Sequence, residues 1–275
     1  MSDFRWKGNG PEFLTVGRGR AWRLHVGASE PGPTSSDERS YAKLLALQSI
    51  AAIGRPAERA FGGATLREFA RRQGCVQATY SPPGWGGLTV RATWGPTRSQ
   101  GGLDLEVQLS ATSVGQLKRV EVGIISGWTA EPAESAARVA RWVEPRDIPS
   151  AASSYDGRES ADTLAALTTL PVPLPSWEMI GPRILSAPGF DADTYYVEMV
   201  QPHDCARRIL DQLPGGPAPN RPNVSTRYGL FGHDLEKGVV LRARLRGLWI
   251  RSQTPVATAL ALFEEFLREP PPLGP

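Results

Sequence analysis

The chain has 275 residues, of which 40% are hydrophobic and 21% are charged, and its 31 Lys and Arg residues exceed its 28 Asp and Glu residues by three. This composition is typical of a soluble globular protein and excludes the disordered and collagen-like classes. The length allows one large domain or two ordinary domains, each able to bury a core. No apolar run follows a basic start at the N-terminus and no run of about 18 apolar residues occurs, so we expect neither a secretory signal nor a membrane span.

The cysteine and arginine contents bear on the cellular location and on nucleic-acid binding. Cys75 and Cys205 lie too far apart in the sequence for a CxxC motif, and two cysteines cannot form a four-cysteine zinc site. We therefore expect reduced thiols and, by elimination, a cytoplasmic location. The chain has 27 arginines but only four lysines. The arginines are spread over the whole chain, which favours the codon bias of a GC-rich bacterial genome over nucleic-acid recognition.

The first third of the chain predicts a hairpin and two helices. Alternating apolar residues over 13–26 are typical of two antiparallel strands joined by a glycine turn. A capping box at Ser35–Glu38 and a wide apolar surface predict a helix over 35–54. A second box at Thr65–Glu68 predicts a shorter helix that ends at Gly74.

The most regular pattern follows these helices. Apolar and polar residues alternate in four runs, at 76–81, 88–94, 103–110 and 120–124. This alternation predicts an antiparallel meander with one buried face and one polar face. The connections are too short for the crossovers that a parallel sheet needs.

The region 127–192 lacks a clear period. We predict a long irregular insertion or linker there, between an N-terminal part (1–126) and a C-terminal part (193–275). We expect the C-terminal part to complete the same compact unit.

The C-terminal part is regular again. Alternation predicts a strand over 195–199, and Pro202 predicts the start of a helix that runs to Leu213. Two long strands, 224–231 and 238–250, flank a polar turn. The last helix begins after Thr254 with Pro255 in its first turn, and its apolar stripe should face the sheet. The residues of that stripe are Val256, Ala259, Leu260, Phe263, Phe266 and Leu267.

Together these elements predict an α+β fold, predominantly antiparallel β-sheet, with capped amphipathic helices packed on one face. The element order resembles that of helix-grip folds, in which a curved sheet wraps a helix and encloses a cavity. The meander and the eight tryptophans resemble sugar-processing β-sandwiches instead. The architecture is therefore expected to be helix-grip-like or sandwich-like, and neither implies a function by itself.

No catalytic, metal or nucleotide signature is complete. The chain has no P-loop, HExxH or GxSxG motif, and Gly17–Gly19 lacks the third glycine of a dinucleotide-binding loop. We therefore expect no cofactor and no metal.

Two His-Asp dipeptides, His203-Asp204 and His233-Asp234, combine an imidazole with a carboxylate. Such a pair can act as a general base or bind a ligand. The alternative is structural, since Asp is favoured in the first turn of a helix and in turns. Of the two, we keep His233 and Asp234 as candidate binding residues.

Trp85 lies in a Pro/Gly loop between two strands, where small neighbours cannot shield an indole. An exposed tryptophan on such a loop is typical of a ligand or partner contact. The alternative is that the ring folds back and closes the end of the core.

Arg242, Arg244 and Arg246 fall on one face of the predicted strand 238–250. Three guanidinium groups in one line suit an anionic ligand or an acidic protein partner. The alternative is a solvated face on which they pair across strands with carboxylates such as Glu106 or Glu121.

These patterns favour a non-catalytic binding or interaction protein over an enzyme, since no paired catalytic set is readable. The alternative is a small-ligand-binding protein or enzyme, possibly carbohydrate-related, with a cavity lined by the sheet. The ligand, the protein partner and the oligomeric state stay undefined.

Overall fold

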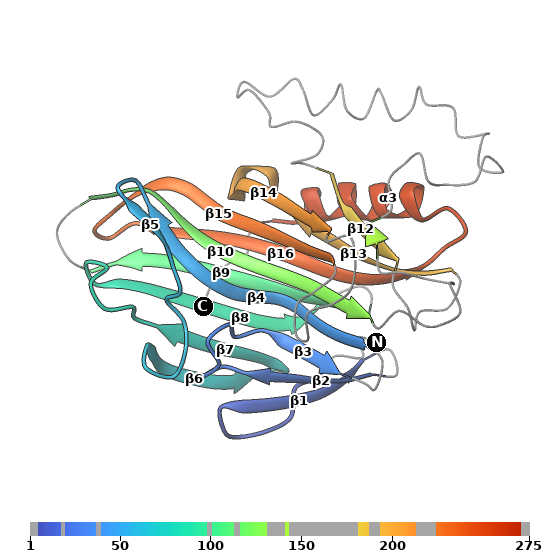
Figure 1. Ribbon diagram of the computed structural model, residues 1–275, viewed down its shortest axis with the longest axis horizontal. Helices are drawn as coiled ribbons and strands as arrows, with labels where there is room; N and C mark the ends of the chain where they lie inside the picture. The colour runs from blue at the N-terminus through green and yellow to red at the C-terminus, as the bar shows by residue number, and fades with distance from the viewer. Residues whose placement is uncertain are drawn as a thin grey trace.

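The computed structural model describes residues 5–17, 20–36, 40–97, 101–112, 116–130, 141–142, 181–186, 193–212 and 224–270. Two antiparallel sheets pack face to face and account for nearly all regular structure in these residues (Figure 1). In the first sheet the order is β1 (Glu12–Gly17), β2 (Arg20–His25), β3 (Pro33–Ser36), β4 (Ser40–Ala52), β10 (Gln116–Ala130), β15 (Val224–Glu236) and β14 (Cys205–Gln212), and β5 (Arg55–Glu58) pairs with β4.

The second sheet also has eight strands. Its order is β11 (Arg141–Trp142), β12 (Arg183–Ser186), β13 (Thr194–Val200), β16 (Val240–Arg251), β9 (Gly102–Ala111), β8 (Leu88–Pro96), β7 (Cys75–Tyr80) and β6 (Leu66–Arg72). The main core lies between the sheets, and aromatic residues span it. The Trp22 and Trp249 rings meet edge to face at 5.4 Å, and the Trp94 indole donates to the Leu45 carbonyl oxygen at 3.0 Å.

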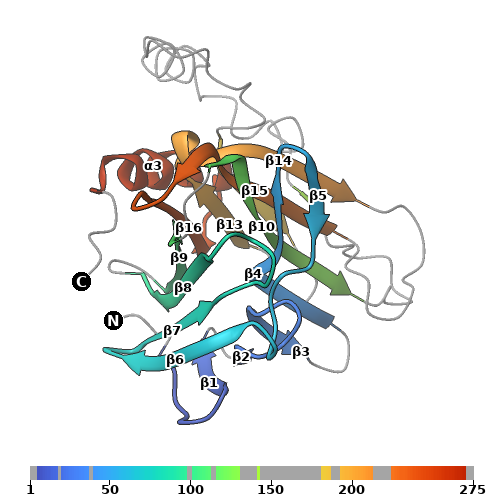
Figure 2. The same ribbon diagram turned by 90° about the vertical axis from the view of Figure 1, so that its left-hand side faces the viewer.

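The helix α3 (Pro255–Arg268) covers the outer face of the second sheet (Figure 2). Ala259, Phe263 and Phe266 are buried against Val197 and Leu248 in a second, smaller apolar cluster. The prediction that this stripe packs on the sheet is confirmed, and Pro255 stands in the first turn as expected. Beyond α3, the described residues hold only short helical turns, and none of their helices is long and apolar enough to cross a membrane.

The prediction of an α+β fold with several helices on one face is wrong. The segment 35–54 forms strands β3 and β4 instead of a helix. In β4 the residues from Leu44 to Leu47 are all buried: an irregular backbone at Leu45, with φ of 45°, lets Leu44, Leu45 and Leu47 all join the main core, and the loop at Gly32 lies directly on Ala46. A strand buried on both faces is apolar at consecutive positions, and periodicity cannot distinguish it from a buried helix.

Two further helix predictions fail for other reasons. The segment 65–74 contains the strand β6, which is mostly exposed and therefore carries little alternation. After Pro202 the chain forms a single 3-10 turn (Pro202–Asp204, labelled η3 here) and continues as the strand β14. Hydrogen bonds to the neighbouring strands β7 and β15 decide both outcomes.

The meander is confirmed for three of its four runs, which form β7, β8 and β9 side by side. The fourth run belongs to β10 and lies in the other sheet, between β4 and β15. The strands predicted at 224–231 and 238–250 exist as β15 and β16, but they also lie in different sheets.

Strands from both ends of the sequence share each sheet. β13, β14, β15 and β16, all from the part 193–275, pair with each other or with β9 and β10. Within 127–192 the structure describes the end of β10 and the short strands β11 and β12; the rest of the predicted insertion lies outside the described residues.

Candidate functional site

Polar side chains replace apolar ones at one end of the main core. Glu198 and Tyr196 come from β13 in the second sheet, and Tyr228 and Ser126 come from β15 and β10 in the first. All four are at most 3% exposed. The interior of a β-sandwich is normally apolar, since burying a carboxyl group without partners costs several kcal/mol. This set, which we term the Glu198 cluster, is therefore our candidate site.

The backbone of β13 places Glu198 inward. Tyr196, Glu198 and Val200 alternate with Val197 and Met199, which contact α3 on the other face. The residue opposite Glu198 on β16 is Gly247. A Cβ atom there would lie 2.2 Å from the Tyr196 hydroxyl oxygen, so only glycine leaves room for that hydroxyl.

Three hydroxyl groups hold the Glu198 carboxyl. Tyr196 donates to Oε1 at 3.1 Å and Tyr228 donates to Oε2 at 2.9 Å. Ser126 also hydrogen-bonds Glu198, while its oxygen accepts the Leu45 amide at 2.8 Å. Burial raises the pKa of Glu198, although these bonds lower it in part. Burial likewise raises the pKa values of Tyr196 and Tyr228. The site thus holds a carboxyl that exchanges its proton nearer to neutral pH than an exposed glutamate does.

Arg208 extends the cluster from β14, where it pairs with Tyr228 of β15. Its Nη1 donates to the Gly181 carbonyl oxygen at 2.7 Å. Its Nε and Nη2 are buried and have no hydrogen-bond partner within the described part of the chain. The hydroxyl of the fully buried Thr226 likewise has no hydrogen-bond partner among the described residues. Buried polar groups without a partner are rare in native proteins, and they indicate a site for a ligand or for an ordered water molecule.

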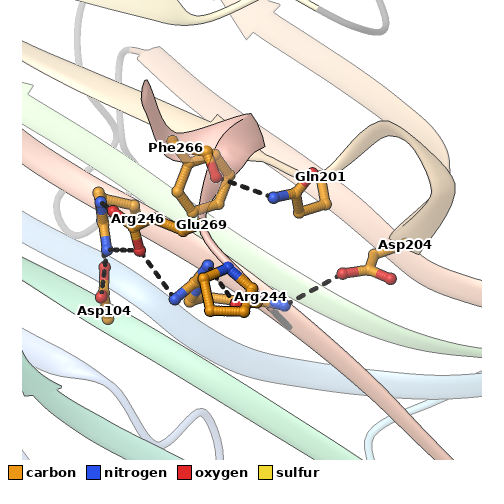
Figure 3. A network of polar contacts seen from close by, with 8 residues as sticks. Asp104, Gln201, Asp204, Arg244, Arg246, Phe266 and Glu269 are labelled. Carbon is orange, nitrogen blue, oxygen red and sulfur yellow. Dashed lines mark hydrogen bonds and ion pairs between the residues drawn. The ribbon is translucent and has the colours of Figure 1, made fainter. Parts of the chain in front are cut away.

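The predicted arginine row has a different environment. Arg244 and Arg246 are 7% and 3% exposed and lie under the end of α3 (Figure 3). Arg246 donates to both oxygens of Asp104, at 2.7 and 2.8 Å, and also bonds Glu269. Burial alone would lower the pKa of Arg246, but the bonds to both carboxylates raise it well above its ordinary value. Arg244 Nη1 pairs at 3.0 Å with Oε2 of Glu269, an oxygen that Arg246 Nη2 also binds.

Arg244 and Arg246 do not lie on the solvated face that the alternative described, because the helix covers them. Both guanidinium groups lie about 5 Å from the Phe266 ring, at 5.1 and 5.0 Å. The alternative of cross-strand pairing describes Arg246, with Asp104 as its partner rather than Glu106 or Glu121. Arg242 lies at the less buried end of the same strand. An anionic ligand for this row stays a prediction.

His203, Asp204 and His233 come together beside Arg244. His203 is 71% exposed, and its Nε2 lies 3.2 Å from Oδ1 of Asp204. The backbone amide of Arg244 donates to Oδ2 of Asp204 at 3.4 Å, and burial raises the pKa of this carboxyl. His233 lies 3.5 Å from the His203 carbonyl oxygen.

Asp234 lies in strand β15 rather than in the predicted turn, and it accepts the Arg119 amide of the neighbouring strand β10 at 2.9 Å. A binding role for His233 and Asp234 is untested. Among the residues that the structure describes, no three potential metal-ligating side chains gather at one place.

Trp85 is 1% exposed, so the expectation of an exposed indole is wrong. Its Nε1 donates to Glu58, and the Arg55 guanidinium lies 3.8 Å from the ring centroid. Arg55 also donates to the Gly84 carbonyl oxygen at 2.7 Å. The loop folds back and β5 residues cover the ring, as the alternative described.

Sequence reasoning missed the Glu198 cluster altogether. In β13 the residues Tyr195, Val197 and Met199 have the pattern of a core face, and Glu198 has the pattern of a solvent-facing residue. The strand is in fact covered on both sides, by the first sheet and by α3. The available signal was the C-terminal amphipathic helix, which has to cover one face of some strand.

Comparisons with known proteins add little to this geometry. No protein-family model matches the sequence, and no curated protein matches it. Among solved structures, the crystal structure of a bacterial glucoamylase complexed with acarbose matches with a TM-score of 0.44 and 9% sequence identity. The match covers 95% of this chain and 33% of that chain.

Proposed function

We propose that the protein is a non-catalytic binding protein that takes a small polar molecule into the end of its sandwich, at the Glu198 cluster. The observation that supports this most is the combination of a fully buried carboxyl with orphaned donors on Arg208. A purely structural core gains nothing from such groups, since apolar residues of similar volume are often neutral or stabilising in their place.

The chemistry of the cluster defines what it can recognise. Tyr228, Tyr196 and the Glu198 carboxyl can exchange hydrogen bonds with hydroxyl or carbonyl groups of a ligand. Small-molecule sites combine apolar walls with a few polar groups that fix orientation, and the tryptophans Trp128 and Trp249 lie in the same core as the cluster. The ring centroids of Trp128 and Tyr196 lie 6.2 Å apart, and those of Tyr196 and Trp249 lie 4.8 Å apart.

The test is a thermal-shift screen of small organic acids, amides, polyols, sugars and amines against the wild type and Tyr228→Phe. Tyr195→Phe is the control, because it removes a tyrosine hydroxyl from β13, the strand that carries Glu198, on the face toward α3. We expect at least one compound to raise Tm for the wild type and for Tyr195→Phe but not for Tyr228→Phe. The proposal is wrong if no compound raises Tm, or if every compound that does so acts equally on Tyr228→Phe.

A further inference from the structure

The guanidinium of Arg208 presents one complete edge without a partner. Nη1 is used by the Gly181 carbonyl oxygen, whereas Nε and Nη2 are buried and have no hydrogen-bond partner among the described residues. Nε and Nη2 carry parallel N–H bonds, which is the arrangement that receives the two oxygens of a planar carboxylate. Arg246, on the outer face of the second sheet, shows this pairing in the same molecule: its Nε and Nη2 each bind one oxygen of Asp104.

The described groups that act on the charge of Arg208 are an arginine, a tyrosine, a cysteine and a glutamate. Arg183 repels that charge, and Tyr228 and Cys205 stay neutral at neutral pH because burial raises the pKa values of both, that of Cys205 to about 11. Among the described residues that act on Arg208, Glu198 contributes a carboxyl, and burial favours its neutral form. Mainly through burial, the pKa of Arg208 itself falls to about 10.

We infer that the ligand of the Glu198 cluster is a small monocarboxylic acid whose carboxylate binds Nε and Nη2 of Arg208. This inference rests on the proposed function and adds the ligand class to it. The edge formed by Nε and Nη2 offers two parallel N–H groups, which are matched by the two oxygens of one carboxylate. A phosphate dianion would bring a second negative charge into a buried site, which costs more desolvation than a single carboxylate does.

The experiment compares acids with their own amides. Isothermal titration calorimetry of the full chain with lactate, benzoate and gluconate, the corresponding amides and inorganic phosphate separates the charge from the rest of the molecule. We expect at least one acid to bind, with its amide and phosphate weaker by about tenfold or more, the loss expected for a charge-assisted hydrogen bond. An amide that binds as tightly as its acid, tighter binding of phosphate, or an absence of binding by all acids overturns the inference.

Variants locate the binding. Arg208→Lys keeps the positive charge and removes the two-nitrogen edge, so acid binding should fall by about tenfold or more. Arg207→Lys is the matched control on the adjacent residue, whose Nε binds Glu121 at the surface. Acid binding that Arg208→Lys leaves unchanged overturns the inference.

A second readout covers a variant that fails to fold. In the absence of ligand, Arg208→Gln should unfold at the same temperature as the wild type or a higher one, since it removes a buried unpaired charge. A clear fall in Tm would assign Arg208 to the structure and overturn the inference. If neutral compounds bind in a manner that depends on Tyr228 while acids do not, the proposed function stands and the ligand class is wrong. If neither binds, both are wrong.

Discussion

Arg246 and Arg208 are both arginines on strands of this sandwich, and their surroundings differ in one respect. Around Arg246 the carboxylates of Asp104 and Glu269 use the donors of the guanidinium and fasten the end of α3 to the second sheet. Around Arg208 two donors are buried without partners among the described residues. A fully paired arginine contributes to structure, whereas a preorganised unpaired one costs stability that only a ligand recovers. The unpartnered donors therefore lie on Arg208, which the sequence did not single out, and not on Arg246 of the predicted row at 242–246.

The largest loss of stability should come from a change in α3, the helix that ends next to Glu269, a partner of Arg246. Phe263→Ala removes a buried ring between α3 and the second sheet, so we expect a loss of about 3–5 kcal/mol in the free energy of unfolding. Chemical denaturation measures it. Leu260→Ala, at a partly buried position of the same helix, should cost clearly less. An unchanged stability for Phe263→Ala would mean that the stripe does not hold the helix on the sheet.

Breaking the paired arginine directly should cost slightly less. Arg246→Ala leaves Asp104 and Glu269 without their shared cation, and we expect a loss of about 3 kcal/mol, the low end for a buried ion pair. Arg251→Ala, at the exposed end of the same strand, serves as the control and should change stability by no more than about 0.5 kcal/mol. Similar losses for the two variants would contradict the contrast between paired and exposed arginines.

A smaller loss of stability is expected when the packing of the Glu198 cluster changes. In Gly247→Ala the new methyl group collides with the Tyr196 hydroxyl, and such overpacking costs about 1–3 kcal/mol. The displaced hydroxyl would also lose its bond to Glu198. The double variant Gly247→Ala/Tyr196→Phe removes the nearest clashing atom, although Cε2 and Cζ of the ring stay at 2.9 Å from the new methyl group, and it should recover part of the stability. If it recovers none, the collision with the hydroxyl is not the cause.

The smallest expected effect is a pH dependence of the unfolding free energy, which reports on the protonation of Glu198. The pKa of Glu198 is raised in the folded protein above its ordinary value of 4.5, so the folded state binds the proton more tightly than the unfolded state. The resulting stabilisation is present below about pH 4.5 and is lost as the pH rises through the raised pKa.

Glu198→Gln removes this titration. The difference in unfolding free energy between wild type and variant should therefore fall as the pH rises from 4 towards neutrality. Asp204 has a raised pKa of the same sign, and the comparison cancels its contribution. Glu265→Gln, an exposed position on α3, should reproduce the wild-type profile. A difference that grows with pH would show that Glu198 is held as a stabilised anion, and a constant difference would show that folding does not shift its pKa.

Local pattern was sufficient for several elements. The alternation in β7, β8 and β9 and the stripe of α3 each follow from one buried face, and a single buried face is visible in a sequence. The hairpin of β1 and β2 followed from the same reasoning. Alternation could not assign strands to sheets, since β9 and β10 show the same pattern and lie on opposite sides of the core.

The sequence by itself determined that this chain is rich in antiparallel strands and that one amphipathic helix ends it, because those features depend on residues close together in the chain. Tertiary structure decided that β4 is a strand rather than a helix, since its second face is covered by a loop. It also decided what each charge does. Asp104 and Glu269 lie 142 and 23 residues from Arg246, and Tyr228 lies 30 residues from Glu198. Pairing at such separations depends on strand order, which no local periodicity encodes, so only the folded chain distinguishes the satisfied arginine from the open one.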